Sequence, residues 1–355
     1  MAIVLGLLAG LSLVILGAEL LVRGAARAAA ALGVSPLLIG LTVVAYGTSA
    51  PELAVSVSAG LTGRPALALA NVVGSNVFNV LAIVGLAALL SPIAADARVV
   101  RREVPIMLAA TVGTMLLAAD GALTRGDGAV LLAGLVAVTL SQFRGARSPR
   151  PAAARAGPTA RGLAGDAGLV LAGLAALVAG SRWLVDAAAA GAAAMGVSEL
   201  VVGLTIVAAG TSVPELATSL VAAVRGERDL AIGNVVGSNV FNLLGVLGAS
   251  ALAAPDGLTI ADQVRSLDAW VALGAAAVLL PMAWSGAAIV RWEGAVLFAG
   301  YVAYLAAVVA IAVGAMGLPS PVTGAAVATL PLAVVLLAAG GGHRRPRPPA
   351  GRGAP

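Results

Sequence analysis

The sequence predicts an all-α polytopic membrane protein, in which two inverted repeats of five transmembrane helices form a ten-helix core and an eleventh helix follows. Three observations predict this fold class. Of the 355 residues, 60% are hydrophobic and only 10% are charged, whereas charged residues make up about a quarter of a soluble domain. Apolar segments of about 20 residues, the length that crosses a bilayer core, recur from end to end. Two motifs of the first half also return in the second half in the same order.

Windows of about 19 residues locate the expected spans. They lie near 2–22, 33–60, 66–90, 103–119 and 127–143, then near 166–187, 196–224, 229–253, 267–284 and 292–316, with a further apolar run at 320–340. The first stretch is interpreted as a helix and not as a cleavable signal, because it has no basic start and continues into further spans. We therefore expect a first repeat at 1–143, a second repeat at 166–316 and an extra transmembrane helix at 317–340.

The distribution of arginine predicts the orientation, since basic residues concentrate in cytoplasmic loops. Residues 144–165 form an expected basic cytoplasmic loop, and residues 341–355 form an expected disordered basic tail. Counting five spans back from the loop places the N-terminus outside a plasma membrane, the inner membrane in a bacterium. An eleventh span would place the basic tail in the cytoplasm as well, which favours eleven spans over ten.

The internal repeat predicts the topology. GVSPLLIGLTVVAYGTSAPEL (33–53) returns as GVSELVVGLTIVAAGTSVPEL (196–216), and NVVGSNVFN (71–79) returns unchanged at 234–242. Because each half has five spans, an odd number, the two halves must enter the membrane with opposite orientation. Inverted repeats with helices interrupted by Gly or Pro at matching positions are typical of secondary transporters, whose sites lie between the halves near the midplane.

The acidic residues in the expected membrane interior reduce to two, Glu52 and Glu215, which are equivalent in the repeat. A carboxylate at this depth indicates a functional site by default. Pro51 and Pro214 cannot donate to the preceding turn, so backbone oxygens near 45–47 and 208–210 become available. Thr48 and Ser49 are expected on the same helical face as Glu52, and their repeat equivalents beside Glu215. The other nearby oxygen-bearing side chains are those of Ser75, Asn79, Ser238 and Asn242.

The available ligands favour a hard cation. The chain has no cysteine, and its single histidine, His343, lies in the polar tail. Calcium takes 6–8 oxygens in irregular geometry, whereas magnesium requires an octahedron. Two buried negative charges are costly in an empty site, so the return step needs other cations or protons, which predicts antiport.

Several polar residues have a structural interpretation at this point. Single serine and threonine side chains in membrane helices often bond their own backbone. The remaining asparagines of the repeated motif are interpreted as bridges between helices; they are Asn71, Asn76, Asn234 and Asn239. Glu19 and Arg23 are four residues apart and are interpreted as a pair along one helix, with a gating contact as the alternative.

The paired motifs GTSAPE…NVVGSNVFN and GTSVPE…NVVGSNVFN resemble the two alpha repeats of the calcium/cation antiporter superfamily, in particular the prokaryotic sodium/calcium exchanger family. The resemblance covers about residues 1–316, with the motifs at 45–79 and 208–242. It implies ion sites between the second and third helices of each half, and alternating access by sliding of the first helix of each half. By motif position the implied ligands are Glu52, Glu215, Thr48, Ser49, Thr211, Ser212, Ser75, Ser238, Asn79, Asn242 and the backbone carbonyls of Ala45 and Ala208.

The resemblance implies an antiporter that exchanges Ca2+ for Na+, with no enzymatic activity and no cofactor beyond the transported ions. Members of this family often carry Asp at one of the positions that Asn79 and Asn242 occupy here. Related cation/proton exchangers manage with two glutamates, so H+/Ca2+ exchange is the alternative. A cation channel is the alternative from another class, although it would not need an inverted repeat. The expected partners are Ca2+, Na+ and membrane lipid, and not nucleic acid; the sequence does not define an oligomeric state.

Overall fold

The computed structural model describes residues 2–94, 97–144, 160–197, 199–202, 205–206, 208–284 and 288–340. Within these residues, seven helices are long and apolar enough to cross a membrane, and a pair of helices bent by 47° makes an eighth. Most of the expected basic loop (144–165) and the whole expected tail (341–355) lie outside the described residues.

The first half contains five expected spans, two of which include a π-helix (η) between α-helices. α1 (Ala2–Leu32) is followed by a broken span of α2 (Pro36–Ile39), η1 (Gly40–Val44), α3 (Ala45–Thr48) and α4 (Ala50–Leu61). The third span is α5 (Pro65–Val77), η2 (Phe78–Val84) and α6 (Gly85–Leu90). The last two are η3 (Val99–Glu103) with α7 (Val104–Leu117), and α8 (Arg125–Arg144). Proline begins α2 and α5, where its missing N–H costs no intrahelical bond.

The second half repeats this order. It begins with α9 (Ala160–Ala194), then α10 (Glu199–Val202), α11 (Ala208–Gly210) and α12 (Val213–Val224). The next spans are α13 (Arg228–Val240), η6 (Phe241–Val246) and α14 (Leu247–Ala253), then η7 (Val264–Asp268) with α15 (Ala269–Trp284), and α16 (Arg291–Ala312). A final helix, α17 (Pro321–Gly340), packs against α15. Whether α17 crosses the membrane as an eleventh span stays a prediction.

Four short strands show that the halves are inverted. β1 (Ile93–Ala94) follows the third span and β3 (Leu258–Thr259) follows its equivalent in the second half. β1 pairs with β4 (Ala288–Ile289), whereas β3 pairs with β2 (Ala122–Leu123). β1 and β2 lie at opposite ends of η3 and α7, so the two strand pairs lie at opposite faces of the bundle. Equivalent connections of the two halves therefore lie at opposite faces.

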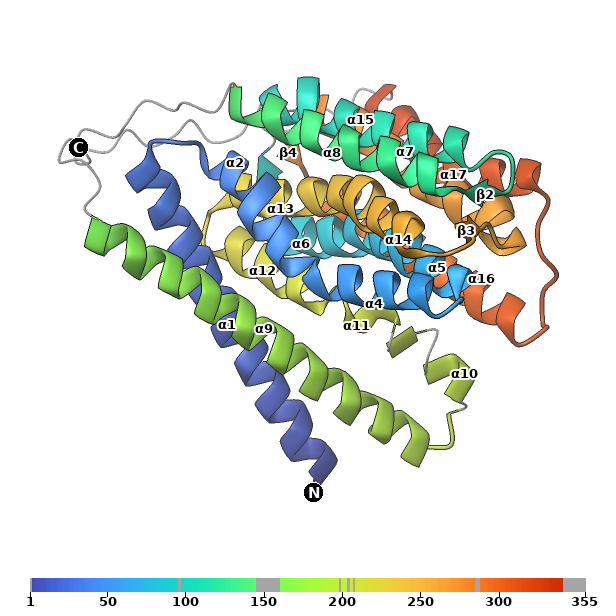
Figure 1. The fold of residues 1–355 in the computed structure, drawn as a ribbon, viewed down its shortest axis with the longest axis horizontal. Coiled ribbons are helices and arrows are strands. Elements are labelled where there is room, and N and C mark those ends of the chain that lie inside the picture. The colour runs from blue at the N-terminus through green and yellow to red at the C-terminus, as the bar shows by residue number, and fades with distance from the viewer. Residues whose placement is uncertain are drawn as a thin grey trace.

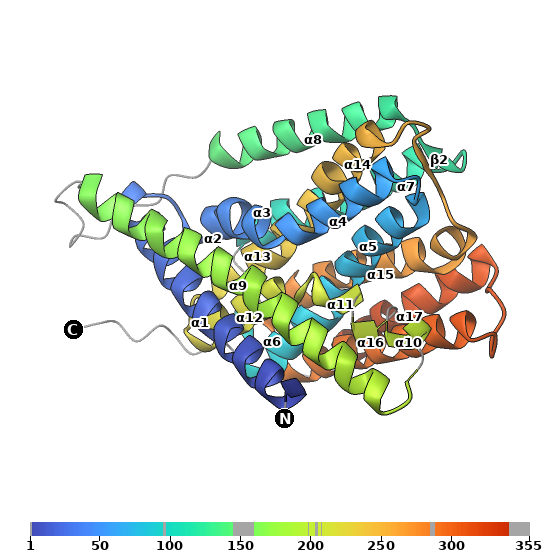
Figure 2. The same cartoon turned by 60° about the horizontal axis from the view of Figure 1, so that its bottom comes forward.

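Helices α1 and α9 cross side by side along one edge of the molecule, while α5 and α13 lie inside the bundle (Figures 1 and 2). The contact between α1 and α9 is formed by small residues that let the two backbones meet. A Cβ atom on Gly17 of α1 would lie 2.7 Å from the Leu177 nitrogen, and one on Gly173 of α9 would lie 2.6 Å from the Leu21 nitrogen. These two helices therefore touch backbone to backbone, with little side-chain interdigitation at the crossing.

We expect Gly173→Leu to destabilise the fold by about 1–3 kcal/mol, because the new side chain must push α1 and α9 apart. The matched control is Gly168→Leu on the same helix, where a Cβ atom meets nothing within 4 Å. Both changes raise helix propensity equally, so the difference between them isolates the packing effect. Thermal unfolding in detergent measures it; equal midpoints for the two variants would refute the close contact.

Candidate ion site

Glu52 and Glu215 lie at the centre of the bundle, and both side chains are 0% exposed. Each occupies the first turn of a helix, α4 or α12, directly after a break in the span. The breaks fall at Ser49 (φ −83°, ψ 9°) and Ser212 (φ −92°, ψ 8°), with a proline in the first turn that follows. A helix N-terminus favours a negative side chain, and each of the two glutamates lies at one.

The carboxylates are held crosswise between the halves. Ser212 Oγ donates to Glu52 Oε1 at 2.8 Å, and Ser49 Oγ donates to Glu215 Oε1 at 2.7 Å. Helical spacing places Ser49 on the same face as Glu52, whereas its hydroxyl bonds the glutamate of the other half. The chain leaves helical geometry at each serine, which turns its side chain toward the facing half. Each half thus supplies the carboxylate of one pair and the hydroxyl of the other.

The threonines follow the same crosswise pattern. Thr48 Oγ1 donates to Asn234 Oδ1 at 3.2 Å, and Thr211 Oγ1 donates to Asn71 Oδ1 at 3.3 Å. Thr48 Oγ1 also lies 3.2 Å from the Ala45 carbonyl oxygen. These contacts tie the broken span of each half to the asparagine-bearing helix of the other half.

Asn71 and Asn234 hold the two glutamates in place. The sequence predicts both asparagines as bridges between helices, and the structure adds that each one bonds the backbone of a glutamate. Asn71 Nδ2 donates to the Glu52 backbone oxygen at 3.3 Å and to Ser56 Oγ at 2.9 Å. The second half repeats both distances with its equivalent residues; these are Asn234, Glu215 and Ser219. Ser56 and Ser219 were not among the predicted site residues, although each follows a glutamate by four residues and the spacing repeats in both halves.

Four buried oxygen atoms of the site have no hydrogen-bond partner among the residues that the structure describes: Glu52 Oε2, Glu215 Oε2, Asn79 Oδ1 and Asn242 Oδ1. The amide nitrogens of the two asparagines donate instead to the other half, Asn79 to Asn239 Oδ1 and Asn242 to Asn76 Oδ1, both at 3.1 Å. This pairing directs both amide donors away and leaves both amide oxygens unpaired. Buried acceptors are normally paired, so this group of four indicates a place for a ligand that accepts oxygen lone pairs.

The remaining predicted ligands are less symmetric. Ser75 Oγ lies 3.5 Å from Glu52 Oε1 and 3.0 Å from Ser212 Oγ. Its equivalent, Ser238, donates to the Ala45 carbonyl at 3.4 Å. The Ala45 carbonyl also accepts the Ser49 N–H at 3.0 Å and is therefore not free in this conformation. Ala208 is the first residue of α11.

Besides Glu52 and Glu215, three carboxylates are buried within the protein among the described residues: Glu103 (1% exposed), Asp268 (4%) and Glu293 (0%). The hydropathy windows placed them at the ends of spans, where charge is ordinary, but folding encloses these ends. Glu103 is neutralised by Arg98 at 3.3 Å, and Glu293 caps α16 by accepting the Val290 N–H at 2.9 Å.

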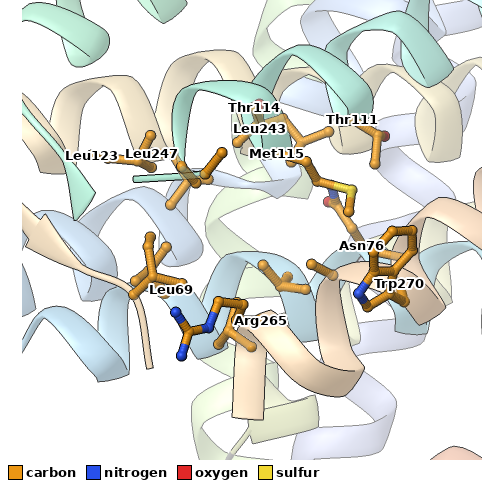
Figure 3. A pocket seen from close by; sticks show the side chains of 17 residues that line it. Leu69, Asn76, Thr111, Thr114, Met115, Leu123, Leu243, Leu247, Arg265 and Trp270 are labelled. Carbon is orange, nitrogen blue, oxygen red and sulfur yellow. The ribbon is translucent and has the colours of Figure 1, made fainter. Parts of the chain in front are cut away.

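A cavity of about 230 Å³ between α5, α7 and α15 does not suit a cation (Figure 3). Its walls are mainly aliphatic and aromatic, with Leu69, Met115 and Trp270 among them, and Arg265 is the charged residue that lines it. A guanidinium and apolar walls repel a metal ion, so the cluster around Glu52 and Glu215 remains the candidate ion site.

The sequence profile of the family described as sodium/calcium exchanger protein matches residues 2–144 and 166–310, one match for each half. The chain belongs to the sodium/calcium exchanger family. It is 41% identical over 307 residues to the CaxA protein of Alkalimonas amylolytica (84% of this chain, 95% of the relative). It is 32% identical over 338 residues to the sodium/calcium exchanger MaX1 of Methanosarcina acetivorans (84% and 96%). The family resemblance is thus confirmed, and the protein is a multi-pass membrane transporter and not an enzyme.

Solved structures of the sodium-calcium exchanger NCX_Mj have the same fold. In crystals soaked with Na+ and Ca2+, that protein superimposes with a TM-score of 0.76 at 29% identity, covering 86% of this chain and 98% of NCX_Mj. A state soaked without either ion gives the same TM-score. The predicted all-α fold with two inverted five-helix repeats is confirmed for this member of the exchanger family.

Proposed function

We propose that this exchanger family member is an antiporter that exchanges Ca2+ for Na+ across the plasma membrane by alternating access. The observation that carries the proposal is that four buried oxygens, two from each half, are unpaired among the described residues, and that η6 with Asn242 packs on α4 while η2 with Asn79 packs on α12. Two carboxylates match the charge of one divalent ion, and amide and hydroxyl oxygens can complete an irregular shell of 6–8 ligands. The names of MaX1 and NCX_Mj support the choice of ions.

The proposed ligands are those that the motifs indicate. Glu52 and Glu215 are the central carboxylates, and Asn79 and Asn242 supply amide oxygens that already lack a partner. The other members would join as the site fills and its hydrogen bonds rearrange; they are Thr48, Ser49, Thr211, Ser212, Ser75, Ser238 and the carbonyls of Ala45 and Ala208.

Alternating access is proposed to use α1 and α9 as the moving pair. Their close, glycine-lined contact would hold the two helices together as one unit that slides against the rest of the bundle. Glu19 on α1 pairs with Arg23 at 2.5 Å, as the sequence predicts, and also with Arg225 at the end of α12. The pair between Glu19 and Arg225 joins α1 to the end of α12, so a slide of α1 along the bundle would have to break it. The N-terminus is proposed to lie outside, from the arginine distribution.

H+/Ca2+ exchange is the second candidate, and one observation favours it. Asn79 and Asn242 leave the site with two carboxylates, and both carboxylates are fully buried. Two protons can neutralise two carboxylates as well as two sodium ions can.

The deciding experiment is uptake of radioactive calcium into proteoliposomes, with an outward Na+ gradient compared with an outward H+ gradient at matched membrane voltage. We expect the Na+ gradient to drive uptake above the level without any gradient. Uptake driven only by the H+ gradient would replace sodium with protons as counter-ion. Uptake that equilibrates equally without either gradient would indicate a channel and overturn antiport.

A further inference from the structure

Asp268 is a buried carboxylate that the central site does not use. It is the last residue of η7, at the start of α15, and is 4% exposed. Tyr304 Oη donates to its Oδ1 at 3.0 Å, and Gln263 Nε2 lies 3.5 Å and 3.4 Å from its two oxygens. None of the ion pairs in the part of the chain that the structure describes includes Asp268, and the neighbouring Arg265 pairs with Asp262 at 2.7 Å instead.

The equivalent position in the first half shows how such a carboxylate can be neutralised. Glu103 is likewise the last residue of a π-helix at the start of the fourth span, and it is 1% exposed. Arg98, five residues earlier, pairs with it at 3.3 Å. Gln263 stands five residues before Asp268 and offers only a neutral amide. The second half therefore keeps a buried charge without the arginine that balances its counterpart, which is costly unless a cation shares the space.

A cavity joins Asp268 to the central site. It measures about 250 Å³, and its lining includes Asp268, Gln263 and Tyr304 as well as Asn71, Ser75 and Thr211. This volume holds several water molecules. Ser75 lies 3.5 Å from Glu52 Oε1, so the cavity borders the central carboxylate. A cation beside Asp268 would therefore share a cavity with residues of the central site without occupying that site.

We propose that Asp268, with Gln263 and Tyr304, forms a second, peripheral cation position at which a partly hydrated Ca2+ ion waits before it enters the site at Glu52 and Glu215. The proposal rests on the proposed function. One carboxylate and neutral oxygens give weak binding, and affinity for calcium rises with the number of charged ligands. Weak binding suits a waiting position, because an ion held firmly there would not move on. A negative charge in a low-dielectric passage raises the local cation concentration and the rate of entry.

Asp268→Asn keeps the size of the side chain and removes its charge. We expect it to raise the KM for Ca2+ about 3- to 10-fold from the face where α15 begins, with uptake at saturating Ca2+ unchanged. Asp262→Asn is the matched control, since it removes a carboxylate six residues earlier that is 73% exposed. An unchanged KM in Asp268→Asn, an equal rise in Asp262→Asn, or a fall only in maximal uptake would each overturn the proposal.

Gln263→Arg tests the same idea with Asp268 in place, because it copies the arrangement of Arg98 and Glu103. We expect it to raise the KM for Ca2+ as Asp268→Asn does, and Asp268→Glu to keep the KM of the original chain. If Asp268→Asn does not fold, as judged by gel filtration and melting, these two variants decide. A Gln263→Arg variant with unchanged KM contradicts the waiting position.

Terbium luminescence separates this proposal from the proposed function, because it does not depend on transport. Tb3+ prefers oxygen ligands as Ca2+ does, and Tyr304, which bonds Asp268, can transfer excitation to a bound ion. In a Glu52→Gln, Glu215→Gln chain, we expect a weak sensitised signal that Asp268→Asn abolishes and Asp262→Asn keeps. A signal that survives Asp268→Asn overturns the peripheral position, whatever the transport assay shows. Absence of any Ca2+ uptake by the original chain overturns the proposed function alone.

Discussion

Glutamine at either Glu52 or Glu215 is expected to lower Na+-driven Ca2+ uptake by a factor of about 100 or more. Removing one member of a buried charged arrangement costs about 3–5 kcal/mol, and each 1.4 kcal/mol is a tenfold change in binding. Both side chains are 0% exposed, so water cannot replace the lost oxygen charge. Initial rates of radioactive calcium uptake in proteoliposomes measure the effect, with Asp262→Asn as the control for loss of an exposed carboxylate.

The same two variants are expected to be more stable than the original chain when Ca2+ is absent. Without Ca2+, the two carboxylates repel each other across the buried site, so removing one charge should raise the melting temperature in calcium-free detergent. Added Ca2+ should stabilise the original chain, because a ligand that binds only the folded state raises its stability. That stabilisation should vanish in both variants. A variant that keeps uptake and calcium-dependent stabilisation would remove Glu52 or Glu215 from the ion site.

Alanine at Ser212 or Ser49 is expected to weaken Ca2+ binding about 10-fold. Each hydroxyl is one of the oxygens proposed to join the ion shell, and an interaction with a charged group contributes about 1.5–3 kcal/mol. Calcium titrations of the melting temperature measure the affinity. Ser58→Ala is the control, because Ser58 is exposed on the same helix as Glu52.

A double-mutant cycle on calcium-free stability tests the crosswise pairing. Ser212→Ala and Glu52→Gln should couple by about 0.5–3 kcal/mol, since the two side chains are in contact. Ser49→Ala and Glu52→Gln, which belong to one half, should be nearly additive. The reverse result, with coupling inside one half and none across, would contradict the arrangement of the site.

Most of the fold could be predicted, because the bilayer imposes it on the sequence. Apolar length predicts the spans, and among the described residues seven helices, or eight spans with the bent pair, are long and apolar enough to cross a membrane. The copied motifs predict the inversion, which the pairing of β1 with β4 and β2 with β3 confirms. The strands themselves went unpredicted, since two residues of strand carry no periodic signal.

The candidate site was predicted as a set of residues and not as a set of contacts. The duplicated glutamate, serine and asparagine positions marked the chemistry before any geometry was known, because buried oxygen groups in a membrane need a reason. Helical spacing places Ser49 on the same face as Glu52, whereas its hydroxyl bonds Glu215, since spacing rules hold only while the helix is continuous. The span breaks at that residue, and no local pattern says which way its side chain then turns.

The sequence by itself determined the class of molecule, the inverted repeat and the identity of the central carboxylates. These follow from the hydrophobicity of the segments and from the duplicated motifs, and both are visible in the linear sequence. Only the tertiary structure decided which half serves which glutamate, which four oxygens lack a partner, and that Asp268 faces a cavity while Glu103 faces an arginine. Those outcomes depend on the approach of segments far apart in the chain, and burial sets the cost of each unpaired charge only after they meet.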